Sequence, residues 1–266
     1  MLRDRVRLLT FLAVGGVACT QSPRGGSPID TRGVGRLELL GSELKFDIVV
    51  EPEGASSVEE EPNDPRGHDA LQILTGPEQA DLRRVVAHER NGDTLVVDAR
   101  KVEGAKVTVL GSVRGLRDLI IEGATGRLDV DPEATTIERI QMRGGELRTD
   151  IRGAAQLSLV LEEKARFRGQ VEVPSLEIKA TSGSLVQLSG STSSVAADLE
   201  DAKAQFLLGR DLVDIQARTS TVDYVCAEGM LKIRAYEGSL IRQSVKCRST
   251  DHDVRMDMSS TIELLR

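Results

Sequence analysis

Residues 175–190 read SLEIKATSGSLVQLSG, and residues 230–245 read MLKIRAYEGSLIRQSV. The two stretches match at an offset of 55 residues, in the pairs Leu176/Leu231, Ile178/Ile233, Ala180/Ala235, Gly183/Gly238, Ser184/Ser239, Leu185/Leu240 and Ser189/Ser244. A weaker copy, RDLIIEGATGRLDV, lies upstream, and its Leu119 aligns with Leu176 at an offset of 57. Both offsets divide into three steps of about 18 or 19 residues, which is a typical length for one coil of a stacked β-solenoid.

Short aliphatic segments continue this period from residue 117 onward. They are Leu119-Ile121, Ile140-Met142, Leu157-Leu159-Leu161, Leu176-Ile178-Ala180, Val195-Ala197, Val213-Ile215 and Leu231-Ile233-Ala235. Alternating apolar and polar residues predict strands with one buried face, and stacking buries the apolar edge that a single coil leaves open. The sequence therefore predicts an all-β fold, a single-stranded right-handed β-helix with coils of about 18–20 residues.

The composition fits a narrow core. Aromatic residues make up 2% of the 266 residues, and Trp is absent. A wide globular core usually needs aromatic side chains to fill its volume, whereas stacked Val, Ile, Leu and Ala fill a solenoid. The shortage of Trp and Tyr also counts against a sugar-binding face that stacks rings. A net charge of −7 with mixed signs argues against nucleic acid as a partner.

Residues 1–18 predict an export signal. Three arginines precede an apolar stretch over residues 8–17, which is shorter than the roughly 20 residues that span a membrane. The small residues before Cys19 resemble the cleavage site of a bacterial lipoprotein signal, although Gly16 stands where leucine is usual. The resemblance implies that Cys19 is acylated, and that Thr20 after it directs the chain to the outer membrane. The alternative is an ordinary secretory signal with a coincidental cysteine.

The rest of the chain divides into three predicted parts. Residues 19–36 are rich in Gly, Ser and Pro and predict a flexible tether behind the lipidated cysteine. Residues 37–116 predict N-terminal strands and an Asn-Gly hairpin that cap the solenoid, with an exposed acidic insertion at 51–69. Residues 117–266 predict the β-helix coils and a C-terminal cap, because uncovered strand edges promote aggregation.

Two cysteines remain once Cys19 carries lipid. Cys226 and Cys247 lie 21 residues apart, about one coil, in a compartment that the signal predicts to be oxidising. Adjacent coils lie about 4.8 Å apart, which suits the Cα separation of roughly 4.4–6.8 Å in a disulfide. The spacing favours a disulfide across two coils, with a pair of buried free thiols as the alternative.

The order of these features resembles a known family. A hairpin over Val85–Val97 precedes coils with Gly-Ser corners at residues 183–190 and 238–241. In these features the chain resembles the head GIN domain family, described as putative auto-transporter adhesins, over residues 40–250. The resemblance implies an exported bacterial protein with a β-helical fold, no established activity and no catalytic residues. The acidic insertion at 51–69 departs from the family's usual pattern.

No residues predict a catalytic, cofactor-binding or metal site. His68, His88 and His252 lack ligand spacing with one another or with the cysteines. The acidic run over residues 59–64 lacks the glycine and the spacing of a calcium loop, so we interpret it as solvated. The serine-rich positions lack a nucleophile elbow and a nearby histidine and predict coil corners instead. These positions are Ser182, Ser184, Ser189, Ser191, Ser193 and Ser194.

We interpret the chain as a non-catalytic module for surface binding, adhesion or scaffolding that a lipid anchors in the envelope. The expected partners are the membrane and an envelope protein or polysaccharide. The alternative is a carbohydrate-active enzyme, a polysaccharide lyase or hydrolase, because paired carboxylates on adjacent strands can perform acid–base chemistry. Such a site would also need basic and aromatic neighbours, for which only Arg210 and Phe206 are near. The carboxylates that raise the alternative are Asp198, Glu200, Asp201, Asp211 and Asp214.

Overall fold

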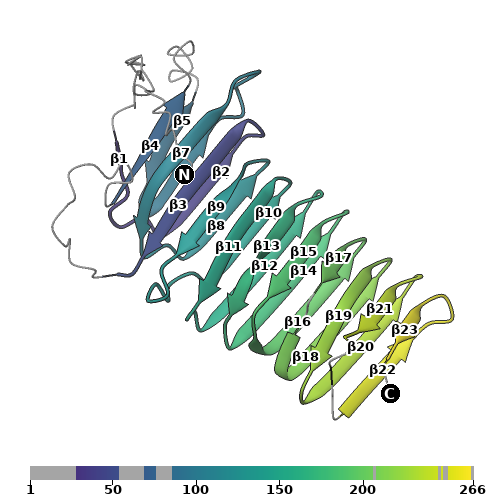
Figure 1. Ribbon diagram of the computed structural model, residues 1–266. Helices are drawn as coiled ribbons and strands as arrows, with labels where there is room; N and C mark the ends of the chain where they lie inside the picture. The colour runs from purple at the N-terminus through teal and green to yellow at the C-terminus, as the bar shows by residue number, and fades with distance from the viewer. Residues whose placement is uncertain are drawn as a thin grey trace, which may run out of the picture.

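The computed structural model describes residues 28–53, 69–75, 86–205, 208–244, 247 and 251–264. Strands stack along one axis, with β2 to β7 at one end and β22 and β23 at the other (Figure 1). No helix occurs in these ranges, and the predicted β-solenoid is confirmed. The predicted signal, Cys19 and residues 54–68 of the acidic insertion lie outside the described residues.

Each coil of the regular part contributes one strand to each of two parallel sheets. The strands of sheet B are β8 (Asp118–Glu122), β10 (Arg139–Arg143), β12 (Gln156–Glu162), β14 (Ser175–Thr181), β16 (Thr192–Glu200), β18 (Leu208–Arg218), β20 (Met230–Tyr236) and β22 (Asp251–Met256). The strands of sheet A are β9 (Thr125–Val130), β11 (Glu146–Arg152), β13 (Arg166–Glu172), β15 (Leu185–Ser189), β17 (Lys203–Gln205), β19 (Thr221–Ala227), β21 (Leu240–Gln243) and β23 (Thr261–Glu263).

The strand register confirms the repeat. Leu176 pairs with Val195, Val195 with Val213, and Val213 with Leu231, so three coils separate the two matching stretches. The weaker upstream copy is aligned differently from the prediction. Through three successive strand pairings, Leu119 corresponds to Ile178 rather than to Leu176, which is a shift of two residues. A shift of two keeps the side chains on the same face, because side chains alternate along a strand.

The core lies between the two sheets. Every second residue of the sheet B strands points inward, as in β14, where Leu176, Ile178 and Ala180 are at most 2% exposed. Sheet A supplies the facing side chains, among them Phe167, which is fully buried. Aliphatic side chains thus lie above one another from coil to coil, and each coil buries the apolar edge of the coil before it.

Stacked corners join each sheet B strand to the following sheet A strand. The backbone takes positive φ there, at Ser182, Asp201, Thr219 and Glu237 among others. The inner side of the corner holds small residues, including Ser184, Ser220 and Ser239, which are at most 2% exposed.

Serine hydroxyls link one corner to the next. Of the serines predicted at corners, Ser182, Ser184 and Ser191 lie between strands, whereas Ser189, Ser193 and Ser194 lie within β15 and β16. Ser220 Oγ donates to the Arg218 carbonyl at 2.7 Å and accepts from the Ala202 N–H at 3.1 Å. Ser239 Oγ accepts from the Ser220 N–H at 3.2 Å. At the next corner the Asp257 carboxylate accepts from the Glu237 N–H at 2.7 Å, which lowers the pKa of Asp257 to about 2.

The N-terminal strands enter the stack out of chain order. They are β1 (Ile29–Asp30), β2 (Arg36–Leu40), β3 (Leu44–Glu51), β4 (Ala70–Thr75), β5 (Ala87–Asn91), β6 (Thr94–Asp98) and β7 (Val107–Arg114). In sheet B, β2 lies between β6 and β8, and in sheet A, β3 lies between β7 and β9. The antiparallel strands β4 and β5 pair with β7 and β6 at the outer end. Within residues 37–116, β2 and β3 are therefore internal to the stack, and β4 and β5 are the covering strands.

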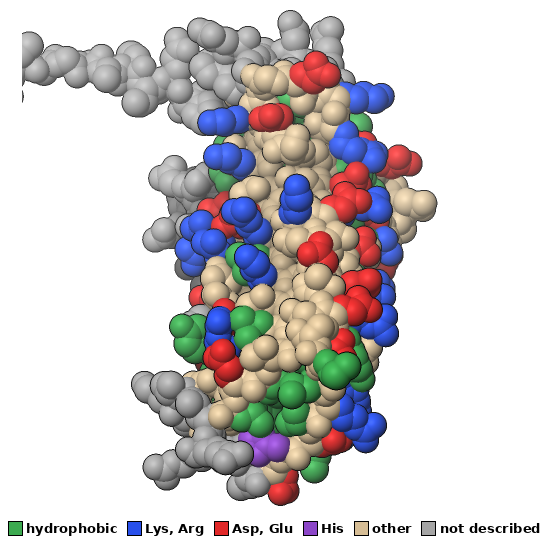
Figure 2. Space-filling model, turned by 90° about the vertical axis from the view of Figure 1, so that its right-hand side faces the viewer, with side chains coloured by type: hydrophobic (Ala, Val, Ile, Leu, Met, Phe, Trp, Pro, Cys, Tyr) green, Lys and Arg blue, Asp and Glu red, His purple; other side chains and the backbone are tan. Residues whose placement is uncertain are grey.

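The C-terminal coil leaves its inward positions accessible. Val254 and Met256 of β22 pair with the buried Ile233 and Ala235, yet they are 37% and 58% exposed because no described strand follows them. Hydrophobic side chains accordingly reach the surface toward this end, while acidic and basic side chains intermingle over the rest of the same view (Figure 2).

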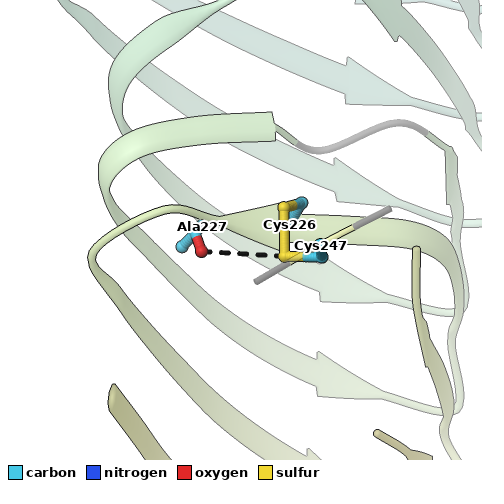
Figure 3. Close-up of a disulfide and its surroundings, with 3 residues drawn as sticks. All are labelled: Cys226, Ala227 and Cys247. Carbon is cyan, nitrogen blue, oxygen red and sulfur yellow. Dashed lines mark hydrogen bonds between the residues drawn. A yellow bond between two sulfur atoms is a disulfide. The ribbon is translucent and has the colours of Figure 1, made fainter. Parts of the chain in front are cut away.

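A disulfide joins two successive coils near this end. Cys226 in β19 and Cys247 have Cα atoms 5.3 Å apart and bonded sulfur atoms (Figure 3). Cys247 Sγ lies 3.6 Å from the carbonyl oxygen of Ala227.

Removing the Ser220 hydroxyl is expected to destabilise the stack. In Ser220→Ala the buried N–H of Ala202 loses its acceptor, at a cost of about 1–3 kcal/mol in the free energy of unfolding. The matched control is Ser194→Ala, whose hydroxyl makes only a 3.4 Å contact with the Pro174 carbonyl at the surface. Urea unfolding measures both variants, and equal stability of the two would contradict the role of Ser220.

Opening the disulfide is expected to lower stability in the last coils. The bridge closes a loop between positions 226 and 247, and the chain-entropy model assigns such a loop about 3 kcal/mol. Thermal unfolding of the oxidised and reduced chains, with thiol counting, measures this effect. An unchanged melting temperature, with two free thiols in the untreated chain, would show that no bridge forms.

Candidate binding groove on sheet A

A groove of about 980 Å³ runs along the outer face of sheet A. Outward-facing side chains of β3, β9, β11, β13 and β15 line it, so it crosses several coils of the stack. The alternation within each strand produces this face: while Leu147 and Phe167 point into the core, Arg148 and Arg168 point outward.

Three arginines occupy the same position on consecutive strands of the groove. Arg127, Arg148 and Arg168 are direct neighbours in the parallel register, and we call them the arginine ladder. Asp47 precedes the ladder, and Gln187 follows it. Neighbouring strands lie about 4.8 Å apart, so the guanidinium groups are carried at a regular spacing along the solenoid axis.

The first two arginines of the ladder are neutralised by carboxylates of their own strands. Arg127 Nε lies 2.5 Å from Asp129 Oδ1, and this hydrogen bond raises the pKa of Arg127. Arg148 Nη2 lies 3.0 Å from Glu146 Oε1. Residues two apart on a strand share a face, which explains why these pairs form within one strand.

Arg168, the third arginine of the ladder, lacks a carboxylate partner on its own strand. Its neighbours two residues away on β13 are Arg166 and Gln170, neither of which is acidic. Its Nε is buried and has no hydrogen-bond partner among the residues that the structure describes. Leaving a buried donor without an acceptor costs free energy. An anion or another acceptor that binds at this point of the groove would remove that cost.

A second column of polar side chains runs beside the ladder. Asp129 pairs in register with Asp150, Asp150 with Gln170, and Gln170 with Ser189. We call these four residues the acceptor column. Asp150 Oδ1 accepts from the Gln170 N–H at 3.0 Å, which ties the column to the backbone of the next coil.

Glycines line the groove where neighbouring strands approach closely. They are Gly126, Gly169 and Gly190, of which Gly126 and Gly169 occupy inward positions of their strands. At Gly169 a Cβ atom would lie 1.9 Å from the carbonyl oxygen of Thr149 on the neighbouring strand. The close approach of β11 and β13 beneath Arg168 thus requires glycine at this position.

The carboxylates of the enzyme alternative lie away from the groove. Among them, Asp214 on sheet B forms an ion pair with Arg234 of the next coil at 3.0 Å. Asp198 and Glu200 lie on β16, Asp201 lies in a corner with positive φ, and Asp211 lies in β18. The five carboxylates of the enzyme alternative therefore belong to strands and corners, and Asp214 is already paired.

The other residues considered in the sequence do not gather at the groove. His88 is exposed on β5 and His252 on β22, whereas His68 and Phe206 lie outside the described residues. Within the described ranges no three His, Cys, Asp or Glu side chains form a group that could hold a metal ion. The same ranges contain no helix with the length and apolarity needed to cross a membrane.

Comparison with known proteins identifies the family. A family model described as "Putative auto-transporter adhesin, head GIN domain" matches residues 78–246. The chain belongs to the head GIN domain family. No curated protein and no solved structure shows significant similarity to the chain. The head GIN match includes the whole arginine ladder, whereas β2 and β3, which are inserted into the stack, precede it.

Proposed function

We propose that this chain is a non-catalytic surface binding module, used in adhesion or as a scaffold, that holds its ligand in the groove on sheet A. The observation that carries the proposal is Arg168, whose buried Nε donor has no acceptor within the described part of the chain. The family description indicates a surface-exposed, adhesin-like protein, which supports a binding role.

The rigidity of the solenoid supports binding without catalysis. The ladder residues lie on strands that are paired on both sides, as β13 is with β11 and β15. A preformed surface of this kind loses little conformational entropy when a ligand binds. None of the five carboxylates of the enzyme alternative lines this groove, so the groove does not favour that alternative.

The proposal includes an envelope location. An acylated Cys19, followed by the tether over residues 19–36, would hold the solenoid at the outer membrane and leave the groove accessible. The support for this part is the lipoprotein-like sequence before Cys19. Several acyl chains together anchor a protein firmly, since each buried CH₂ contributes roughly 0.8 kcal/mol.

Binding of envelope material is expected to depend on Arg168. The detergent-solubilised full chain is applied to immobilised polysaccharide and protein fractions of the cell envelope. Arg168→Gln is expected to lower the affinity about tenfold or more, because a hydrogen bond to a charged group is lost. Arg139→Gln is the matched control, since Arg139 lies on sheet B and contacts Gln141 rather than a carboxylate. Equal retention of the two variants would reject the groove as the binding site.

Membrane attachment is expected to depend on Cys19. Cys19→Ala should move the chain from the membrane fraction to the soluble fraction, and Thr20→Ala should leave it attached. Fractionation of cells followed by immunoblotting measures the distribution. A Cys19→Ala chain that stays in the membrane fraction would argue for an ordinary signal and a different mode of attachment.

A further inference from the structure

We propose that the ligand of the groove is a linear acidic glycan, a polymer with carboxylates on its sugar residues, lying parallel to the solenoid axis. Its carboxylates would pair with Arg168 and its neighbours, and its hydroxyls would bind the acceptor column. This inference rests on the proposed function and adds the chemical class of the ligand.

The charge around Arg168 favours a carboxylate. Arg166 lies two residues away on β13, and Arg148 is the direct neighbour of Arg168 on β11. Arg148 forms an ion pair with Glu146, whereas neither Arg166 nor Arg168 forms an ion pair within the described ranges. The planar guanidinium binds carboxylates through two parallel hydrogen bonds, which provides both charge and geometry for recognition.

The acceptor column distinguishes a glycan from other polyanions. Asp150 lies directly beside the ladder and would repel a ligand with dense negative charge, such as a nucleic acid or a strongly acidic peptide, whereas Asp129 is already paired with Arg127. A glycan also brings hydroxyl groups, which donate hydrogen bonds to carboxylates. Only a ligand with separated carboxylates and many hydroxyls satisfies both columns.

The direction of the ligand follows from the stacking. Both columns run from coil to coil, and the groove spans β3 to β15. The amide of Gln187 continues the ladder and donates to Gln205 Oε1 at 2.7 Å, which extends a polar track toward the next coil. A polymer lying along the axis contacts equivalent side chains at the strand spacing, whereas one lying across it meets the ladder once.

The test uses polygalacturonate as the probe and its methyl ester, which has the same backbone without charge, as the matched ligand. Titration calorimetry of the detergent-solubilised full chain should show binding of polygalacturonate that weakens with added salt. The affinity should fall about tenfold or more in Arg168→Gln and stay unchanged in Arg139→Gln. Asp150→Asn should increase binding of polyphosphate relative to polygalacturonate.

Three results would overturn the inference. They are equal binding of the methyl ester, equal loss in the two arginine variants, and binding of polyphosphate or polyglutamate as tight as that of polygalacturonate. Retention of envelope material that depends on Arg168, without any binding of polygalacturonate, would reject the acidic glycan and leave the proposed function standing. If neither Arg168-dependent retention of envelope material nor binding of polygalacturonate is found, the groove is rejected as a binding site.

Discussion

Parallel pairing between strands one coil apart, with inward side chains directly above one another, is the constraint on which this molecule depends. The pairing of Leu176, Val195, Val213 and Leu231 shows how it operates, because a shift by one residue would turn every aliphatic side chain outward. The same register places outward residues in straight columns. The core and the groove therefore have one cause, and the arginine ladder is as regular as the aliphatic stack behind it.

Ion pairs occur on both faces of the solenoid. They join neighbouring coils in Arg234–Asp214 on sheet B and in Arg242–Asp223 on sheet A, and such surface pairs stabilise neighbouring strands modestly. On sheet A, the pairs Arg127–Asp129 and Arg148–Glu146 form within strands, and the series ends at Arg168 without a carboxylate. The buried Nε of Arg168, which has no acceptor in the described structure, marks this position for an external ligand.

The sequence was sufficient to predict the solenoid, the sheet B strands and the pairing distance of Cys226 and Cys247. The sheet A strands of the coils after residue 117 were missed, since glycine or threonine takes inward positions in several of them, as at Gly126, Thr149 and Gly169, and the alternation is weak there. The place of β2 within the stack depends on pairing between distant segments, which no local pattern encodes. The arginine ladder could have been predicted from the sequence, since Arg127, Arg148 and Arg168 recur at about the coil length. Charged residues were instead interpreted as solvated.

The inserted coil made by β2 and β3 has a consequence for how the protein assembles. Its partners on both sides come later in the chain, β6 and β7 on one side and β8 and β9 on the other. While the chain emerges from its N-terminus, residues 36–51 have two unsatisfied edges until about residue 130 is available. The first half of the chain must therefore close as a single unit, and the remaining coils can then add to it one at a time.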